Sequence, residues 1–380
     1  MRIIHTSDWH LGMMKTQTSG YREDQEHFIA EICEVIDREG ARAVLLSGDV
    51  YDTGISRAEA LALFDRACEM ICGQRGCDLV VIAGNHDSGS RLAQHAGLLA
   101  RSHLHIAGTL GRQVTPVVLD GGAVTVWPLP WFARDEAAAF TADGTVPPTT
   151  ESAMMTVTDS VRGRMGPGFH ILMAHAYVVG APLGLSDRAA QVGLSDAVSR
   201  DVFAGFGYVA LGHIHRHYAV PGTDDRVVYC GSPMHFAFDE EGQEKGCMLI
   251  DTEEGTSRFV RFTPLHGRKT VTGTLAEVTD PAAVSAAAGC YTRVFVTDRE
   301  KSLPLRSELL ALYPDMLQLQ GAQHEGEGGA ALTVAELEQL GDIPLMKRFL
   351  SEQYALEPDE RQVRRFEKAL QKVMNGGDRA

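Results

Sequence analysis

The stretch Ile3-Ile4-His5-Thr6-Ser7-Asp8-Trp9-His10-Leu11-Gly12 begins as an apolar run and continues into an aspartate and a histidine two residues apart. A short apolar run without helical periodicity is typical of a buried strand. Side chains that follow a strand stand at its carboxyl end, where α/β proteins place their ligand-binding groups. The stretch therefore predicts an α/β fold with a carboxylate and an imidazole at the end of its first strand.

Four further blocks repeat this arrangement. They are Gly48-Asp49, Gly84-Asn85-His86-Asp87, His175 and Gly212-His213-Ile214-His215, and they follow the apolar runs 44–46, 79–82, 171–173 and 208–211. Together the five blocks offer seven oxygen and nitrogen ligands, enough for two ions that share one carboxylate: Asp8, His10, Asp49, Asn85, His175, His213 and His215. A lone histidine in an apolar strand is more often a packed core group, but the order and context of all five blocks favour a metal site.

Composition is typical of a soluble globular chain of two or three domains, with 380 residues, 44% of them hydrophobic and 22% charged. The seven cysteines are scattered and odd in number, and Met1 leads directly into a strand without a signal peptide, so we expect a cytoplasmic protein. No C-x-x-C pair supports a zinc cluster at Cys68, Cys72 and Cys77. No apolar run approaches the roughly 20 residues that span a bilayer.

The formal net charge of −15 disfavours a protein that grips nucleic acid over its whole surface. Two divalent ions would still leave the site itself positive toward a phosphate. The acidic balance also suggests that a partner supplies much of any grip on DNA.

Pattern changes along the chain predict three parts. Residues 1–268 alternate strands with helical segments such as 23–39 and 57–71, which indicates a layered α/β domain. Residues 269–340 read as a small α/β module, with strands at 270–275, 291–297 and 316–319 and helices after Pro281 and at 305–312. Residues 341–380 read as two helices separated near Pro358, with apolar stripes at Met346, Phe349, Leu350 and Tyr354 and at Val363, Phe366, Leu370 and Val373. These stripes either fold back on the body or bind a partner.

The ordered blocks D-x-H, GD, GNHD, H and GHxH resemble the calcineurin-like metallophosphoesterase superfamily. Residues 6–12 and 47–52 resemble its nuclease branch in double-strand break repair. Residues 208–216, 231–233 and 238–245 are similar to the SbcD family, the nuclease subunits of bacterial SbcCD complexes. The resemblance implies a four-layer sandwich of two mixed sheets flanked by helices, with a small α/β capping domain that selects DNA and C-terminal helices that bind the partner.

The resemblance also implies roles for individual residues. Asp8, His10, Asp49 and His215 would hold a first ion, and Asp49, Asn85, His175 and His213 a second, with Asp49 as the bridge. His86 would protonate the leaving oxygen, Asp87 beside it would orient His86, and Asp52 could lie near the substrate. Mixed oxygen and nitrogen ligands suit Mn(II), Fe(II) or Zn(II) better than Mg(II), and the family implies Mn(II).

The implied activity is that of a 3′-to-5′ double-strand exonuclease and single-strand or hairpin endonuclease in DNA repair, recombination and replication. The implied partner is an SbcC-type ABC/SMC-like ATPase, because the chain itself has no G-x-x-x-x-G-K-[ST] loop to bind ATP. The implied assembly is a heterotetramer that contains a homodimer of this chain. Two alternatives stay open: a metallophosphoesterase for small phosphoesters, such as a phosphatase or cyclic-nucleotide phosphodiesterase, and a non-catalytic DNA-end scaffold. The capping module and the terminal helices disfavour a phosphoesterase for small substrates. The complete set of metal ligands, together with His86, disfavours a non-catalytic scaffold.

Overall fold

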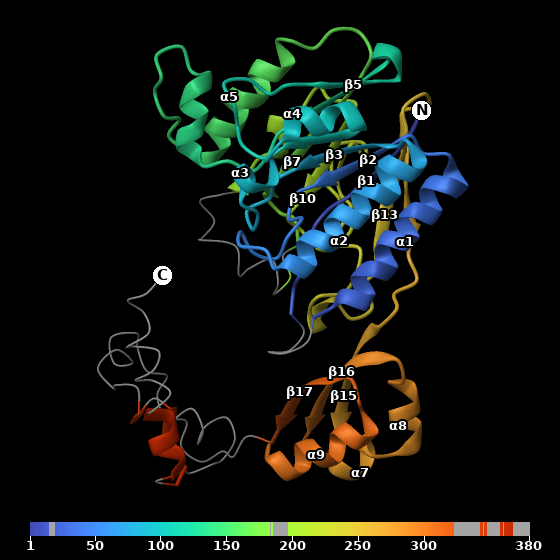
Figure 1. Ribbon diagram of the computed structural model, residues 1–380, viewed down its shortest axis with the longest axis vertical. Coiled ribbons are helices and arrows are strands. Elements are labelled where there is room, and N and C mark those ends of the chain that lie inside the picture. The colour runs from blue at the N-terminus through green and yellow to red at the C-terminus, as the bar shows by residue number, and fades with distance from the viewer. Residues whose placement is uncertain are drawn as a thin grey trace. The chain divides into compact units, whose positions relative to one another are not determined.

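A computed structural model describes residues 1–14, 20–182, 184, 197–322, 343–344, 346–347, 358–359 and 361–367 (Figure 1). The chain divides into two compact units, Met1–Gly267 and Arg268–Ala380. Within the described ranges, no helix combines the length and the apolar character needed to cross a membrane.

The first sheet of unit 1 has the strand order β14-β13-β1-β2-β3-β4. Four strands are parallel: β1 (Arg2–Thr6), β2 (Ala43–Ser47), β3 (Asp78–Ile82) and β4 (Leu104–Ala107). β13 (Gly246–Asp251) and β14 (Thr256–Arg261) extend the sheet in antiparallel fashion. Strands buried on both faces require near-continuous apolar sequence, which explains why the runs before the first three blocks lack alternation.

The second sheet has the order β11-β12-β10-β7-β6-β5. Its parallel centre consists of β6 (Val124–Pro128), β7 (Phe169–His175), β10 (Tyr208–Gly212) and β12 (Val227–Tyr229). β5 (Val117–Leu119) and β11 (Tyr218–Ala219) form antiparallel edges. The register pairs Gly212 of β10 with His175 of β7, so two of the ligand-bearing blocks emerge side by side.

The two sheets pack face to face through an apolar core that joins Ile3, Leu45 and Val80 of the first sheet to Ile171 and Met173 of the second. Helices α1 (Arg22–Glu39) and α2 (Ala58–Cys68) cover the outer face of the first sheet (Figure 1). α5 (Thr150–Arg162) covers the second, where its apolar side packs on the alternate residues of β7 and β10. The predicted four-layer sandwich of two mixed sheets flanked by helices is confirmed.

Unit 2 contains a three-stranded sheet in the order β15-β16-β17. Its elements are β15 (Gly267–Gly273), α7 (Leu275–Val278), α8 (Pro281–Ala286), β16 (Cys290–Val296), α9 (Leu303–Leu312) and β17 (Met316–Gly321). The strands and helices predicted for this module are present, and α7 is an addition. The module has a small core of its own, which contains Val294, Val296, Leu309 and Met316. This core identifies a separate α/β module.

The C-terminal region is described only in short pieces. Residues 361–367 are helical, and the Asp359 carboxylate accepts the Gln362 backbone N–H at 2.7 Å, as a helix N-cap does. Most of the predicted apolar stripes, including Phe349, Leu350, Tyr354, Leu370 and Val373, lie outside the described residues.

Candidate metal centre

All seven predicted ligands lie at the carboxyl ends of five strands drawn from both sheets. Asp8 and His10 follow β1, Asp49 follows β2, Asn85 follows β3, His175 ends β7, and His213 and His215 follow β10. Parallel strands present their carboxyl ends on one edge, and face-to-face packing places the two edges together. Residues from 8 to 215 therefore meet in one site.

A first group of ligands surrounds His10. Its Nε2 lies 3.1 Å from Nε2 of His215 and 3.7 Å from Oδ2 of Asp49. One ligand atom each of Asp8, His10 and His215 lies within 4.8 Å of the others, and all three residues are buried. Nδ1 of His10 is a buried nitrogen without a hydrogen-bond partner among the described residues. This group suits a cation that accepts the lone pairs of both facing imidazoles.

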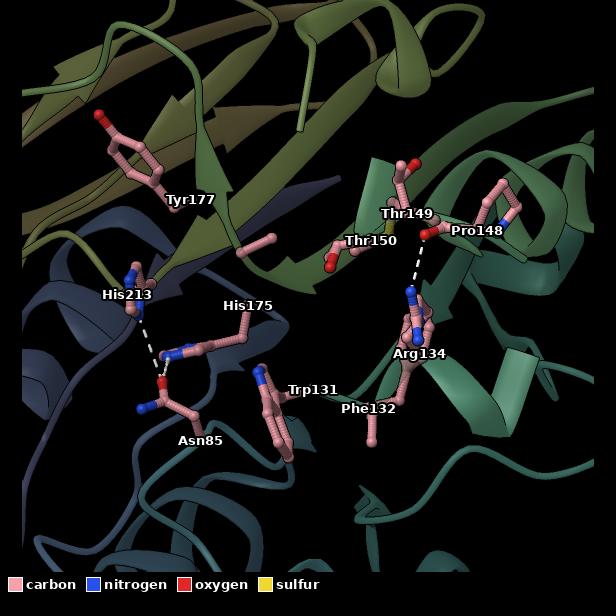
Figure 2. Close-up of a pocket in the computed structure, with 13 residues that line it drawn as sticks. Asn85, Trp131, Phe132, Arg134, Pro148, Thr149, Thr150, His175, Tyr177 and His213 are labelled. Atoms are coloured by element: carbon pink, nitrogen blue, oxygen red, sulfur yellow. Dashed lines mark hydrogen bonds between the residues drawn. The ribbon is translucent and has the colours of Figure 1, made fainter. Parts of the chain in front are cut away.

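A second group surrounds Asn85, whose Oδ1 lies 3.0 Å from Nε2 of His175 and 3.2 Å from Nδ1 of His213 (Figure 2). Nε2 of His175 lies 3.3 Å from Oδ2 of Asp49. The other oxygen of Asp49, Oδ1, accepts the backbone N–H of His86 at 2.9 Å. Oδ2 of Asp49 therefore faces both groups of ligands, as a bridging carboxylate oxygen must.

The pKa shifts of the candidate ligands support a bound cation between the two ligand groups. Burial raises the pKa of Asp8 and lowers the pKa of His10 and of His213 to about 3, so both imidazoles stay neutral and offer lone pairs. Burial alone would raise the pKa of Asp49, but His175 holds it below its ordinary range. Burial likewise opposes charge on His175, yet Asp49 raises its pKa to about 9. A proton thus balances Asp49 where a metal ion would, and carboxylate, amide and imidazole donors fit a divalent transition ion.

Four of the seven candidate ligands have strained backbone conformations. Asp8, His10, Asp49 and His213 have positive φ values of 53°, 42°, 49° and 97°. Such conformations cost about 1–3 kcal/mol each and persist where the surroundings enforce them, often at functional sites. They redirect the chain sharply after β1, β2 and β10 so that the side chains turn toward the centre.

Glycines in the blocks let backbone segments approach closely. A Cβ on Gly84 would stand 2.1 Å from Oδ1 of Asp49, and a Cβ on Gly212 would stand 1.9 Å from the carbonyl oxygen of Ser47. Gly84 before Asn85 and Gly212 before His213 are thus packing requirements of the centre.

We expect Gly84→Ala to lower metal affinity about 10- to 100-fold, the effect typical of disturbing groups that support metal ligands. The added methyl must displace the Asp49 carboxylate. Isothermal titration with Mn(II) measures the change. Gly97→Ala in α4 (Ala96–Leu99) is the matched control, because its Cβ meets no atom within 4 Å. Wild-type affinity in Gly84→Ala would mean that the loop yields instead of Asp49.

The second ring nitrogens of two histidine ligands contact groups to which the sequence prediction assigned no role. Nδ1 of His175 faces the carbonyl oxygen of Ser47 at 2.9 Å, and Nδ1 of His215 faces Oε1 of Glu240 at 3.3 Å. The partner of a histidine's second nitrogen fixes its tautomer and ring orientation. In the sequence, Glu240 stands out only as part of the 238–245 segment.

Glu240 belongs to a buried ion pair. Its Oε2 lies 2.8 Å from Nζ of Lys245, and the two side chains are 2% and 1% exposed. Lys245 also donates to the His215 carbonyl oxygen at 2.8 Å and to Ser232 at 2.9 Å. Burial would raise the Glu240 pKa, but the Lys245 charge holds it well below its ordinary value. The pair locks both the ring and the backbone of His215.

Glu240→Gln should lower the free energy of unfolding by about 3–5 kcal/mol, because it leaves Lys245 as a buried uncompensated charge. Replacing both partners, as Glu240→Leu with Lys245→Met, should recover much of that stability but not the metal affinity, since His215 still lacks its carboxylate. Urea unfolding and metal titration separate the two effects. Full recovery of affinity in the double variant would remove Glu240 from the support of His215.

His86 and Asp87 have separate hydrogen-bond partners beside the metal centre. His86 is half-buried, and its Nδ1 lies 2.9 Å from the carbonyl oxygen of Asp52. The Asp87 carboxylate instead accepts backbone N–H bonds from Gly84 (2.9 Å), Val50 (3.1 Å) and Tyr51 (2.9 Å). Asp87 thus ties the loop after β2 to the loop after β3, while the Asp52 carbonyl oxygen is the hydrogen-bond partner of the His86 ring. The Asp52 carboxylate lies 3.8 Å from Nδ1 of His10.

A cavity of about 560 Å³ opens beside the second group of ligands. Asn85, His175 and His213 form one side of it, and Figure 2 shows Trp131 near them with Arg134 opposite. The full lining adds Phe132, Ala133, Pro148, Thr149, Thr150, Met154, Ala176 and Tyr177. A substrate phosphate at the metal centre would have this cavity next to it.

Two family models agree with the fold and the site. The model for calcineurin-like phosphoesterases matches residues 1–217, more than half of the chain. A second model, SbcD_C, described as the type 5 capsule protein repressor C-terminal domain, matches residues 261–354. Among solved structures, the crystal structure of TT1561 of Thermus thermophilus is 15% identical, with a TM-score of 0.41 over 68% of this chain and 98% of that chain.

Calcineurin-like phosphoesterases use divalent metal ions, and candidate ligands for such ions converge in this chain. The C-terminal match adds the domain that accompanies SbcD-type phosphoesterases. The chain therefore belongs to the calcineurin-like phosphoesterase family, as a member of the SbcD type.

Proposed function

We propose that this protein is the nuclease subunit of an SbcCD-type complex and hydrolyses DNA phosphodiester bonds with two Mn(II) ions. The observation that carries the proposal is the position of Asp49, whose Oδ2 lies 3.7 Å from the His10 nitrogen of one ligand group and 3.3 Å from the His175 nitrogen of the other. A shared carboxylate oxygen between two ligand groups is the arrangement that two-metal hydrolysis of phosphoesters needs.

The side chains divide into holding and proton-transferring groups. Asp8, His10, Asp49 and His215 would hold one ion, and Asn85, His175 and His213 would hold the other together with Asp49. When bound, the ions would acidify the attacking water and neutralise the phosphoryl oxygens. His86 is the group left to serve the departing oxygen.

His86 is suited to that proton transfer by its contacts. Nδ1–H donates to the Asp52 carbonyl oxygen, which leaves Nε2 to carry the proton that the leaving oxygen receives. The His86 ring centroid stands 4.9 Å from that of His10, edge to face, so His86 lies at the centre. General acid catalysis of this kind contributes about 10²- to 10⁴-fold to a rate.

The DNA specificity, the cell compartment and the partner are further parts of this proposal. We assign 3′-to-5′ exonuclease activity on duplex ends and endonuclease activity on single strands and hairpins, in the cytoplasm, within a heterotetramer that contains two copies of this chain and an SbcC-type ATPase. The SbcD_C match at residues 261–354 supports the partner. All seven cysteines are free thiols, as is usual in a reducing compartment.

The decisive assay compares labelled linear and hairpin DNA with bis-p-nitrophenyl phosphate, using the full chain and Mn(II). We expect metal-dependent cleavage of DNA at an efficiency well above that of the small diester. If the small diester is hydrolysed efficiently while the DNA remains uncut, the small-phosphoester alternative is favoured. Tight binding to DNA ends with no hydrolysis of either substrate would favour the scaffold.

The terminal segment provides a separate prediction. Deletion from Pro344 onward should leave metal-dependent cleavage of single-stranded DNA measurable but prevent stable assembly with the ATPase. An amphipathic helix gains affinity by laying its apolar stripe into a groove, and this deletion removes both predicted stripes. Co-purification with the ATPase measures assembly. Wild-type affinity of the truncated chain for the ATPase would mean that the segment only packs on this protein.

A further inference from the structure

The cavity beside the second group of ligands has one unusual wall residue. Trp131 is 46% exposed, while its neighbours in the same segment, Leu129 and Phe132, are 0% and 8% exposed. A single exposed apolar side chain is common on protein surfaces. This one, however, is a flat aromatic surface in a cavity that also contains three candidate metal ligands, Asn85, His175 and His213.

The backbone holds Trp131 firmly beside the metal centre. Its N–H donates to the carbonyl oxygen of Ala83 at 2.8 Å. Ala83 lies two residues before Asn85, in the same loop that follows β3. The indole is therefore positioned relative to the ligands through the backbone, and a change of the side chain alone leaves this anchor in place.

The facing wall carries positive charge. Arg134 is exposed there, and its guanidinium donates to the carbonyl oxygen of Pro148 at 2.7 Å (Figure 2). In a chain of net charge −15, a cation on the wall of the cavity that contains these ligands favours a polyanionic strand over a neutral ligand. A cavity of about 560 Å³ is also within the usual range for sites that enclose a small organic group.

We propose that this cavity is a base-binding subsite, in which the base of a nucleotide next to the scissile phosphate stacks on Trp131 while Arg134 attracts the strand. The proposal rests on the nuclease function above and specifies how the substrate is held. Stacking on an aromatic ring accepts every base, because each base has a π-face. The subsite therefore favours unpaired or frayed strands without selecting a sequence.

This subsite predicts a preference for an unpaired strand at the cutting point. A base within a duplex is covered on both faces by its neighbours, and unstacking it costs a few kcal/mol. A single-stranded or frayed nucleotide avoids most of that cost. We therefore expect cleavage to be faster where the nucleotide beside the scissile phosphate is already unstacked.

Trp131→Ala should raise the KM for single-stranded oligonucleotides by about 5- to 150-fold, the range expected from the loss of one base-stacking contact. Trp131→Phe should keep most of the affinity. Leu98→Ala, which removes another exposed apolar side chain (67% exposed) in α4, is the matched control and should change nothing.

An abasic substrate makes the test specific. A tetrahydrofuran spacer is placed at the nucleotide on either side of a single cleavable phosphodiester, with the other linkages blocked as phosphorothioates. At the stacked position the spacer should reduce cleavage by the wild-type protein by the same factor as Trp131→Ala does on a normal strand. Trp131→Ala itself should cleave the normal and the abasic strand equally well. Equal losses for Trp131→Ala on normal and abasic strands, or no loss on either, would overturn the stacking role.

Fluorescence provides a readout that needs no catalysis. The chain has three tryptophans, and Trp9 and Trp127 are buried. A short single strand added in the presence of EDTA should quench the emission of the full chain, and Trp131→Phe should abolish this response. An unchanged response in Trp131→Phe would refute the subsite. Failure of wild-type protein to cut any DNA, with quenching intact, would refute the nuclease proposal alone.

Discussion

Asp49→Ala should eliminate metal-dependent hydrolysis, with a loss of about 10³-fold or more, because one side chain serves both ion sites. A metal ion supplies several kcal/mol of transition-state stabilisation, and each 1.36 kcal/mol changes a rate tenfold. Oδ2 of Asp49 lies within 3.7 Å of a nitrogen in each ligand group. Removing it leaves two cations without their shared anion. Calorimetric titration should show that both tight sites are lost.

Two further variants separate charge from backbone effects. Asp49→Asn keeps an oxygen that can accept the His86 N–H but removes the negative charge, so we expect it to resemble Asp49→Ala in metal affinity. Asp225→Ala tests whether this protein tolerates alanine at a positive φ, because exposed Asp225 has nearly the same φ (55°) as Asp49 (49°). We expect wild-type activity for that control. Retention of two tight sites in Asp49→Ala would exclude the bridging role.

His86→Ala should reduce DNA cleavage about 10²- to 10⁴-fold, the range for loss of a general acid, while both metal ions stay bound. Metal binding survives because the contact of residue 86 with Asp49 is made by its backbone N–H, which alanine retains. Metal analysis of the purified variant, together with nuclease assays, measures the two effects separately.

The leaving group distinguishes an acid from a ligand. p-Nitrophenolate departs without protonation, so hydrolysis of bis-p-nitrophenyl phosphate should fall much less than DNA cleavage in His86→Ala. His95→Ala, a change at an exposed histidine, should affect neither substrate. Equal losses on both substrates would exclude proton donation, and loss of bound metal would show that His86 is a ligand.

The fold class was accessible from sequence because its signals are local. Each apolar run before a ligand block became a strand, and the helices predicted at 23–39 and 57–71 correspond to α1 and to α2 with the π-helical turn Glu69–Gly73 that follows it. The small module also has its predicted strands. Periodicity and burial act over a few residues, so a single sequence contains this information.

Several features of the centre had no sequence signal. Lys245 and Glu240 are two charged residues in a charged segment, and only folding shows that they are buried behind His215. Asp87 follows His86 in the chain, yet its carboxylate points to backbone groups of another loop. Adjacent side chains in a turn need not point the same way.

By itself the sequence determined the α/β class, the strand that precedes each ligand block and the set of residues able to bind metal. Only the tertiary structure decided which oxygen of Asp49 faces both ligand groups, which backbone carbonyl orients His86, and that Trp131 stands beside Asn85 in one cavity. The physical reason is that a strand's apolar pattern is written within the strand. Contacts across the centre depend instead on strand order, sheet packing and positive-φ turns, which join residues far apart in the chain.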